Sequence, residues 1–428
     1  MSQLHGHITV EEYVDVIGGS VESHIVCANG GRISAITPPG CWGPMITPNI
    51  LGGHEVTRPV YVEGAEFGDS IAISIEKIEV LSHVCSSGTC MPIKENFDRD
   101  PSVQAICPHC HTVHPKTYLE GIGENAIRCS GCGQPIIPQT YENGYTVAYS
   151  APDNIAVAVP LEGAVEIAHQ TNRGEVFLPH GSRQHLATIL GRADFDGLPI
   201  RCRPMIGNIG CVPAIPIPSS KNTGDFAVSL EKTSLFTVPS REQLTDAHMD
   251  INLVGEGSVV ISPVLVQGGG VYFGDVHLTQ GCGEVAGHTL DVCAKIVVRV
   301  QVMKGLQLAG PIILPTINDL DSRFRPFTQD EYSKAEVLYQ KFFGSTLPHS
   351  YPIQVVGTGK GMDDAFQNAL HRTVQLTGLP AGEVMNRLTV GGEICIGRTS
   401  GCVYLTILLE SKTLEHTGLL SLVEAQYQ

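Results

Sequence analysis

The sequence predicts a mainly β fold, with a β-sandwich or barrel-like core, a C-terminal α+β region and an inserted cysteine-rich segment. The 428-residue chain contains 47 Gly and 27 Pro but only 16% charged residues, a composition typical of short strands joined by many turns. Short runs rich in Val and Ile, bounded by Gly, Pro or polar residues, indicate strands before Leu314. After Leu314 the pattern changes to one with helical periodicity.

These patterns divide the chain into four predicted segments. Residues 1–84 form the N-terminal β part of the core, which includes a strand at IAISIEKIEVL. Residues 85–142 form the insertion, residues 143–314 form the β core with the presumed site, and residues 315–428 form the α+β region. A chain of this length is long enough for roughly two or three domains with a sizeable core.

Charge and cysteine content limit the class of protein. A net charge of −16 disfavours a nucleic-acid partner bound through a basic face. The N-terminal residues lack the positive and apolar regions of a signal peptide, and no apolar run is long enough to span a bilayer. Fourteen cysteines without an export signal indicate reduced thiols and metal ligands instead of disulfides. We therefore expect a soluble cytoplasmic protein with no nucleic-acid and no membrane partner.

The insertion contains two C-x-x-C pairs with eighteen residues between them. This spacing is typical of a structural zinc ribbon, in which four thiolates close a tetrahedral site, and a pair of redox motifs is the alternative. The surrounding residues are poor in apolar side chains, so Zn²⁺ binding would supply the folding energy. The predicted ligands are Cys107, Cys110, Cys129 and Cys132, with His109, His111 and His114 as nearby substitutes.

The segment HEVTRPVYVEGAEFGD, which begins at His54, is the first candidate for a site. It concentrates charged residues around the apolar run PVYV, which would anchor the residues at its two ends. We predict that His54, Arg58 and Glu63 bind substrate. Glu55 and Glu66 are expected to lie in a solvated loop.

A stretch between residues 250 and 284 is the central candidate. Two apolar runs, 259–266 and 271–273, are separated by three glycines and bounded by polar residues. Runs of this kind, rich in Val and Ile, predict paired buried strands. Upstream, RPMIGNIGCVP is another buried-strand pattern, and its glycines would let a ligand or backbone approach closely.

The polar residues of this stretch are of types that bind a metal or move a proton. Period-two alternation places Asp275 and His277 on one face of the second strand. Gln280 and Glu284 follow in a Gly-rich turn, and Asp250 precedes the first strand. Taken singly, each has the alternative of being a buried polar group that is merely hydrogen-bonded. Their concentration predicts catalytic roles for Asp250, His277, Gln280 and Glu284.

The last segment is predicted to be a small α+β unit. Thr328 and Glu331 form a capping box that opens a helix, which ends at Gly344. YPIQVV indicates a strand, and MDDAFQNALHRTVQLTG indicates an amphipathic helix with Ala369 and Leu370 on its apolar face. We expect this unit to serve packing or assembly and the chemistry to lie elsewhere.

Four successive segments resemble signature segments of the acetamidase/formamidase family: RPVYVEGAEFGDSIAI, RPMIGNIGCVP, HMDINLVGEGSVVISPV and FGDVHLTQGCGEVAG. The resemblance covers most of the chain outside residues 85–142. It implies a mainly β homo-oligomer that hydrolyses a small linear amide to carboxylate and ammonia. Two departures lie beside the presumed site, because Cys282 stands where the family usually has Asp and Arg58 stands where it usually has Gly.

Amide hydrolysis needs an activated water, a stabilised oxyanion and an acid for the leaving amine. The sequence has no G-x-S-x-G elbow and no Gly/Ser-rich run that would house a Ser–Ser–Lys triad, which leaves a carboxylate or metal route. We predict that Asp250 and His277 hold a second divalent metal, with zinc preferred, and an open position for water. Glu284 would be the general base, Gln280 would orient the carbonyl, and His54 would be a third ligand or the acid.

Two rival hypotheses stay open. Cys282 could attack the carbonyl with His277 as its base, although a Cys in a Gly turn is usually inert. In the other, the chain is a non-enzymatic binding or regulatory protein that docks a protein partner through the zinc ribbon. Arg58 also bears on the substrate. A guanidinium facing the pocket would favour an amide that carries a carboxylate, whereas pairing with a neighbouring glutamate would not.

Overall fold

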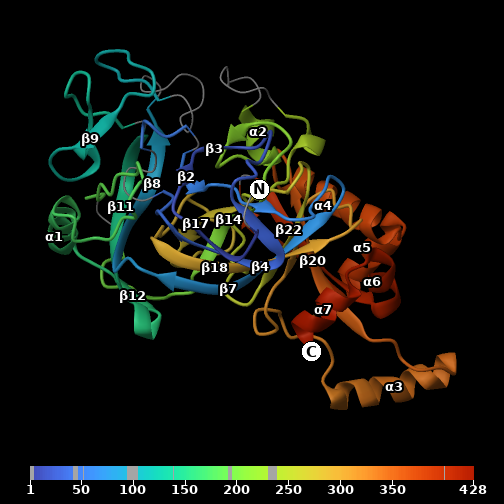
Figure 1. Cartoon of the computed structure of the whole chain (residues 1–428). Helices are drawn as coiled ribbons and strands as arrows, with labels where there is room; N and C mark the ends of the chain where they lie inside the picture. The colour runs from blue at the N-terminus through green and yellow to red at the C-terminus, as the bar shows by residue number, and fades with distance from the viewer. Residues whose placement is uncertain are drawn as a thin grey trace.

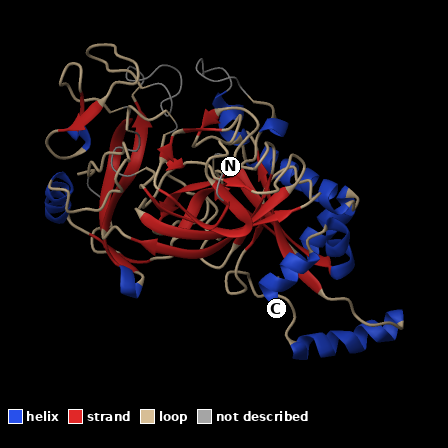
Figure 2. Cartoon of the chain, in the orientation of Figure 1, coloured by secondary structure: helices blue, strands red, loops and turns tan. Residues whose placement is uncertain are grey.

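The structure is a computed structural model, and its described residues form five open sheets with edge strands at both ends (Figure 1). Figure 2 shows that strands dominate and that most helices gather at one end of the molecule. The mainly β prediction is confirmed, but the barrel-like alternative is not, since no sheet closes on itself within the described part of the chain. The described residues are 4–41, 47–51, 53–93, 105–137, 139–190, 195–229, 239–399 and 401–428.

The largest sheet has ten strands and joins the two ends of the chain to its middle. In β18 the sequence AKIVVRVQVM alternates buried with more exposed side chains, as a strand with one covered face does. Because this sheet joins three of the four predicted segments, the segment boundaries stay a prediction. The strand order is β1 (Leu4–Val10), β4 (Val26–Thr37), β18 (Ala294–Met303), β7 (Ser70–Val80), β16 (Val259–Pro263), β19 (Ile312–Leu314), β20 (Ser350–Thr358), β22 (Cys402–Glu410) and β21 (Glu393–Arg398), with β6 (Tyr61–Val62) beside β4.

A four-stranded antiparallel sheet carries the centre of the site. Its order is β14 (Met205–Cys211), β17 (Val271–His277), β5 (Val56–Thr57) and β2 (Tyr13–Val14). Every residue of β14 and β17 is buried. The predicted strands β16 and β17 both form, but the prediction that they pair is wrong, because they belong to different sheets. Gly268, Gly269 and Gly270 all have positive φ and turn the chain from one sheet to the other.

The predicted insertion lies between two long paired strands. Residues 94–104 and 138 of this segment lie outside the described residues. A small hairpin of β9 (Thr117–Leu119) and β10 (Ile127–Cys129), joined through η2 (Glu124–Ala126), forms its described core. The flanking sheet has the order β13 (Pro199–Arg201), β12 (Ile155–Ala158), β11 (Gln139–Ser150) and β8 (Val84–Pro92), with η3 (Ala151–Asp153) and α1 (Leu161–Asn172) beside it. The remaining short elements are β3 (Val16–Ile17), β15 (Ile217–Pro218), α2 (Thr223–Ser229) and η4 (Arg241–Gln243).

The C-terminal region is an α+β unit, as predicted, and β20 and β22 extend the main sheet into it. The capping box of Thr328 and Glu331 opens α3 (Gln329–Phe343), which ends at Gly344 with φ of 66°. Figure 1 shows α3 projecting away from the body of the molecule. The other helices are α4 (Met362–Thr377), α5 (Ala381–Gly391), α6 (Ser411–Thr417) and α7 (Leu420–Tyr427).

No helix of the described residues is both long enough and apolar enough to cross a bilayer.

Candidate active site and metal centre

The end of β17 and the loop after it hold the centre of the site. β17 carries Asp275 and ends with His277, and the following loop supplies Gln280 and Glu284. His277 also bridges to Asp291, which precedes β18. Other parts of the chain contribute His54, His248, Asp250 and Arg398 to the same cavity.

The backbone around these side chains is shaped for close approach. Asp250, Asp275 and Glu284 have φ of 48°, 58° and 39°, in the left-handed region that residues other than Gly seldom adopt. A Cβ at Gly40 would collide with the Asp275 carboxylate, and one at Gly207 would collide with the carboxylate of Asp250. Residues held in such conformations concentrate at functional sites, where the surrounding structure over-determines them. Bringing these carboxylates together therefore requires strained backbone conformations.

Asp275 lies at the centre of the cluster and is 2% exposed. Its Oδ2 lies 3.2 Å from His248 Nε2 and 3.5 Å from His54 Nε2. Its Oδ1 lies 3.4 Å from His277 Nε2, which is also 3.5 Å from Asp291 Oδ1. Charge-assisted N–H···O bonds are typically about 2.7–2.9 Å long. The contact of 3.2 Å is a long hydrogen bond, whereas the separations of 3.4 and 3.5 Å are those of atoms that could share an ion.

Hydrogen bonds on the outer side of two imidazoles set their tautomers. His248 Nδ1 lies 2.7 Å from the carbonyl oxygen of Ser220, which can only accept. His277 Nδ1 lies 2.7 Å from Gln280 Oε1, while Gln280 Nε2 donates to the carbonyl oxygen of Asp250. Each Nδ1 therefore carries a hydrogen, so that each ring, when neutral, would present its Nε2 lone pair to the cluster. Such outer bonds orient metal-binding histidines.

Eight polar atoms of the cluster are buried without a hydrogen-bond partner in the described part of the chain. Buried polar groups are nearly always hydrogen-bonded, and an unpaired buried carboxylate is costly. The carboxylate oxygens among them lie near imidazole and guanidinium nitrogens without hydrogen-bond geometry, and such a concentration of carboxylates and imidazoles fits a bound cation. The atoms are His54 Nδ1 and Nε2, both carboxylate oxygens of Asp250 and of Asp291, Asp275 Oδ1 and Glu284 Oε2.

The ionisable groups respond to a buried excess of negative charge. Burial opposes charge on His248, but the carboxylate of Asp250 raises its pKa to about 10. Burial likewise opposes charge on His277, yet Asp291 and Asp275 raise its pKa well above the ordinary value. Burial, together with the charge of Asp250, raises the pKa of Glu284 well above its ordinary value. All three directions indicate that the cluster attracts cations, whether protons or a metal ion.

A cavity of about 90 Å³, which suits a small molecule, is lined by His54, His248, Asp250, Asp275 and Glu284 among others. Arg398 enters it from the end of β21. One terminal nitrogen of its guanidinium donates to both oxygens of Asp225 at 2.9 and 2.8 Å, and the other lies 3.4 Å from Asp250 Oδ2. The cavity thus places a permanent positive charge beside the carboxylates and imidazoles.

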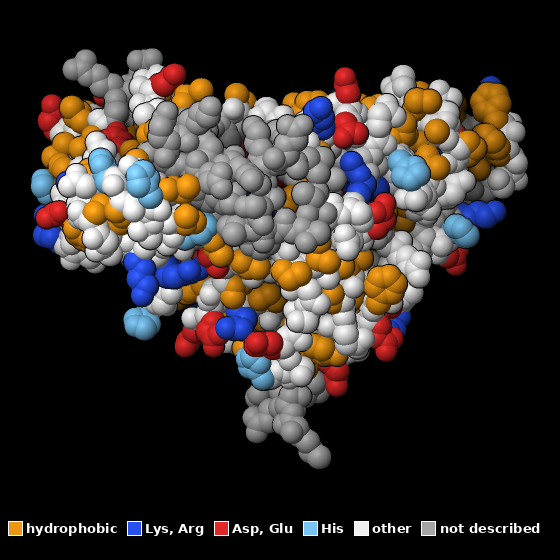
Figure 3. All heavy atoms as spheres, turned by 90° about the horizontal axis from the view of Figure 1, so that it is seen from above, with side chains coloured by type: hydrophobic (Ala, Val, Ile, Leu, Met, Phe, Trp, Pro, Cys, Tyr) orange, Lys and Arg blue, Asp and Glu red, His pale blue; other side chains and the backbone are white. Residues whose placement is uncertain are grey.

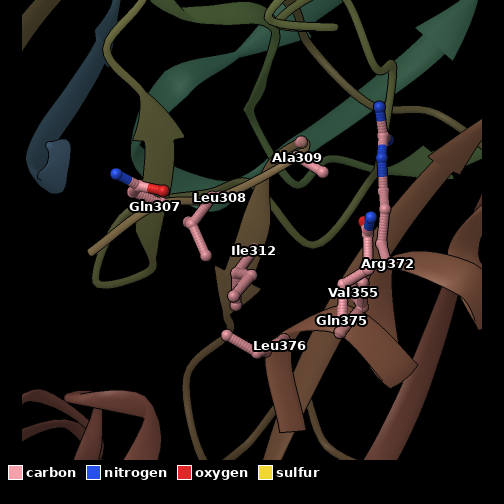
Figure 4. A pocket seen from close by; sticks show the side chains of 9 residues that line it. Gln307, Leu308, Ala309, Ile312, Val355, Arg372, Gln375 and Leu376 are labelled. Atoms are coloured by element: carbon pink, nitrogen blue, oxygen red, sulfur yellow. The ribbon is translucent and has the colours of Figure 1, made fainter. Parts of the chain in front are cut away.

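A larger pocket of about 320 Å³ lies between the loop 307–310 and α4 (Figure 4). Its centre is apolar, and among the described residues Arg372 is the one ionisable residue that lines it. The guanidinium of Arg372 already donates to Asp246 at 2.6 Å and to the carbonyl oxygen of Val356 at 2.7 Å. Among the described residues, no nucleophile, carboxylate or imidazole lines this pocket, whereas side chains of all three kinds line the smaller cavity.

Comparison with known proteins decides the family. The model of the acetamidase/formamidase family matches residues 34–377, which is most of the chain. The chain belongs to the acetamidase/formamidase family. Membership makes this protein a hydrolase that acts on the C–N bond of amides, as the resemblance of its segments implied.

Solved structures show the same fold as this family member. A predicted acetamidase/formamidase from Thermoanaerobacter tengcongensis has a TM-score of 0.53 at 17% identity, over 96% of this chain and 98% of its own. Acetamidase from Yersinia enterocolitica has a TM-score of 0.52 at 16% identity, over 96% of this chain and 93% of its own. Acetamidase from Bacillus halodurans has a TM-score of 0.52 at 15% identity, over 97% and 99%. Comparison with curated proteins gives no match.

Five of the site residues predicted for this family member lie together. Ligand atoms of Asp250, His277 and Glu284 lie within 4.8 Å of one another, and all three residues are buried. Gln280 bonds to His277, and His54, which lines the cavity, lies against the central Asp275. The buried glycines of β14 also allow the close approach that the RPMIGNIGCVP pattern predicted.

Arg58 and Glu63 are not brought to the cluster of this family member. Arg58 donates to Glu12 and, at 3.0 Å, to Glu22, and these three side chains lie at the surface. Its guanidinium is thus paired with protein carboxylates, although not with the neighbouring glutamates. Glu63 is exposed. The expectation that Glu55 lies in a solvated loop is wrong, because Glu55 is 1% exposed.

Sequence reasoning missed His248, Asp291 and Arg398. His248 stands two residues before Asp250 in HMDIN, and alternation alone would have placed the two on one side. Asp291 has no local signal, since it meets His277 only through a bridge between separate segments. Arg398 belongs to the C-terminal region, which we expected to stay outside the site. That expectation is wrong, because Arg398 lines the cavity.

The four cysteines of the predicted ribbon come together. Cys107 Sγ lies 3.6 Å from Cys132 Sγ, Cys110 Sγ lies 3.7 Å from Cys129 Sγ, and all four thiols lie within 4.8 Å. Zn–S bonds of ~2.3 Å in a tetrahedron separate the sulfur atoms by about 3.8 Å. Hydrogen bonding to Thr112 lowers the pKa of Cys110 to about 6, which favours a thiolate. Figure 3 shows histidine side chains on the surface at this end, but four thiolates complete a tetrahedral site without them.

Proposed function

We propose that the buried cluster hydrolyses a small linear amide to a carboxylate and ammonia, using water activated by a divalent metal. The observation that carries this proposal is the set of eight buried carboxylate and imidazole atoms without hydrogen-bond partners among the described residues. Imidazole nitrogen and carboxylate oxygen form common zinc sites, so the donor set fits zinc. The cavity of about 90 Å³ supports a small substrate.

Asp250 and His277 would hold the ion, which supplies a water whose pKa is lowered toward neutrality. Gln280 acts as a positioning residue, because its amide oxygen accepts from His277 Nδ1 and its amide nitrogen donates to backbone oxygen. This role differs from the one predicted from the sequence, in which Gln280 orients the substrate carbonyl, because both ends of its amide are bonded to protein groups. Glu284 is the general base. Its raised pKa, caused first by burial, suits a carboxylate that must accept a proton near neutral pH.

Arg398 supplies the stabilisation of the oxyanion in this proposal. It is 9% exposed, it lines the cavity, and its Nε has no partner among the described residues. Its two bonds to Asp225 hold the guanidinium in one orientation. A guanidinium keeps its charge at physiological pH, so its N–H groups can stabilise negative charge that develops on the carbonyl oxygen.

The thiol route has less support. Cys282 is exposed, and its Sγ lies 3.6 Å from Asn252 Nδ2. His277 is a poor base for it, because Nδ1 bonds to Gln280 and Nε2 faces carboxylates. Cys41 lines the cavity, but burial raises the pKa of its thiol well above the ordinary value and disfavours the nucleophilic thiolate. Nothing in the described part of the chain favours the non-enzymatic alternative.

Ammonia release from a panel of small amides tests the function. Asp250→Asn and Glu284→Gln should each lower kcat by orders of magnitude and should combine non-additively, because the two residues act as one unit. Glu162→Gln on the exposed face of α1 is the matched control and should keep wild-type activity. Treatment with a chelator should abolish turnover and added Zn²⁺ should restore it. Full turnover by protein whose cluster holds no metal would contradict the metal route.

We also propose that the ribbon zinc is structural, that the protein is cytoplasmic, and that it forms a homo-oligomer. All fourteen cysteines are free, which suits a reducing compartment. The helix α3 buries none of its residues and exposes several large apolar side chains, and surfaces of this kind usually mark an interface. Light scattering on the purified chain tests self-association, and a monomer at micromolar concentration would contradict it. The exposed apolar side chains of α3 are Val337, Leu338, Phe342 and Phe343, which are 71%, 62%, 73% and 67% exposed.

A further inference from the structure

The α4 pocket, which is the larger pocket of about 320 Å³, has two chemically different sides (Figure 4). Leu308, Ile312 and Leu376 lie on one side, and Arg372 with Gln375 lies on the other. The two polar residues are three positions apart in α4, a spacing that puts them on one face of the helix. Sites for small molecules usually have volumes of roughly 300–1,000 Å³. The size and the two sides of this pocket therefore suit an amphipathic small molecule.

The side chain of Arg372 brings an unpaired donor to the α4 pocket. Arg372 is 4% exposed, and its two terminal nitrogens donate to Asp246 and to the carbonyl oxygen of Val356. Its Nε is buried and has no hydrogen-bond partner among the described residues. A buried donor without an acceptor is destabilising, and nearly all buried donors have one. An acceptor atom of a bound molecule would therefore complete the hydrogen bonds of this guanidinium.

The ion pair with Asp246 determines which kind of acceptor suits Arg372. Asp246 Oδ2 lies 2.6 Å from the guanidinium, and both side chains are buried. Because this carboxylate already balances the positive charge, an anionic ligand would bring a second negative charge beside it. An uncharged carbonyl oxygen can accept from Nε without that cost. The side-chain oxygen of Gln375 can accept from an amide N–H₂ group, and Leu308 and Leu376 offer contacts to an aliphatic chain.

We propose that the α4 pocket is a second binding site, which takes a small uncharged aliphatic amide. The carbonyl oxygen of the ligand accepts from Arg372 Nε, and its chain packs against the apolar side of the pocket. The identity of the ligand rests on the proposed function, because amides are the substrates of that reaction. Binding itself needs no residue of the cluster at the end of β17. The pocket of about 320 Å³ also admits a longer chain than the cavity of about 90 Å³ does.

Hydrogen bonds connect the α4 pocket to the smaller cavity. Asp246, the partner of Arg372, also accepts from the backbone N–H of Thr223 at 2.9 Å, at the start of α2. The helix α2 carries Asp225, which holds the guanidinium of Arg398 in the smaller cavity. A ligand that accepts from Arg372 changes the bonding at the first member of this series. Its binding should therefore change the kinetics of amide hydrolysis.

Calorimetric titration of the full chain with hexanamide tests the site. Ala309→Trp, which fills the pocket from an exposed position, should abolish binding, and Gln375→Trp fills it from α4 where the first variant fails to fold. Ala381→Trp, at an exposed alanine outside the pocket lining, should bind as the wild type does. Asp250→Asn should also bind normally, because the smaller cavity takes no part. Hexylammonium lacks an acceptor and should bind about tenfold more weakly than hexanamide, or weaker still.

The kinetics of acetamide hydrolysis test the connection between the two cavities. Hexanamide should change the KM for acetamide by about fivefold or more in the wild type, the lower end of typical couplings between sites. The same addition should leave the KM of Ala309→Trp unchanged. A change in KM that persists in this variant would place hexanamide in the smaller cavity and overturn the connection.

The outcomes separate this inference from the proposed function. The site would be overturned by a wild type that does not bind hexanamide, by binding that survives both substitutions that fill the pocket, or by binding that is lost in Asp250→Asn. Equal binding of hexylammonium would overturn the role of Arg372 Nε. An unchanged KM with hexanamide bound would overturn the connection and leave the site standing. Normal binding of hexanamide by protein that releases no ammonia from any amide would support the site and contradict the proposed function.

Discussion

Replacing Arg398 with Met removes a permanent positive charge from the cavity of the proposed site. The guanidinium donates to both oxygens of Asp225 at 2.9 and 2.8 Å and lies 3.4 Å from Asp250 Oδ2. Leaving one member of a buried ion pair uncompensated costs about 3–5 kcal/mol of folding free energy. The side chain of Asp225 keeps 15% of its exposure, so we expect the lower end, about 3 kcal/mol. Loss of an oxyanion donor should also lower kcat about 10²–10³-fold.

The double variant Asp225→Asn/Arg398→Met separates stability from catalysis. Asn at position 225 is uncharged and can still accept from the backbone N–H of Asn222, which lies 2.8 Å from the Asp225 carboxylate. Most of the lost unfolding free energy should therefore return, and urea denaturation measures it. The kcat for ammonia release should stay low while KM changes little, because the missing interaction forms in the transition state. Free guanidinium ion should restore part of the activity of Arg398→Met.

The result that would refute this reasoning is a double variant with wild-type kcat. It would mean that Arg398 only neutralises Asp225 and that the oxyanion is stabilised by other groups. A variant that recovers neither stability nor turnover after the second change would instead show that the guanidinium has packing partners beyond Asp225. In that case, absence of rescue by guanidinium would also count against a role in catalysis.

Three further predictions follow from other parts of the molecule. Cys129→Ser should remove the ribbon zinc and lower the melting temperature, yet the protein that folds should keep its kcat. Loss of kcat at an unchanged melting temperature would contradict a structural role for the ribbon. Arg58→Gly should leave the ratio of kcat/KM for a carboxylate-bearing amide and for acetamide unchanged, because Arg58 pairs with surface glutamates, and a changed ratio would place it in substrate binding. Burial would raise the pKa of Asp246, but Arg372 at 2.6 Å holds that pKa below its ordinary value. The pair therefore stabilises the fold above about pH 4, and this contribution is lost as the pH falls further. The melting temperature of the wild type should consequently fall more steeply with decreasing pH than that of Asp246→Asn. Parallel curves of melting temperature against pH for the two proteins would refute this.

Local chemistry made much of the fold predictable. The capping box of Thr328 and the glycine at 344 bound a helix through hydrogen bonds within a few residues, so the sequence alone places α3. Alternation in β18 and the apolar run in β17 are likewise local patterns. The two C-x-x-C pairs bring four thiols together because each pair lies on one short turn.

The sequence by itself determined the class of fold, the family, and the residues between 250 and 284 that hold part of the cluster. Only the tertiary structure decided which distant residues join them. Asp291 meets the end of β17 through a bridge to His277, Arg398 meets the following loop through a bridge to Gly283, and no local pattern encodes either meeting. The partners of Arg58 also depend on the tertiary structure, because its guanidinium donates to Glu12 and Glu22 from a separate part of the chain. Helix caps and hydrophobic periodicity act over a few residues, whereas strand pairing and ion pairs join residues from across the whole fold.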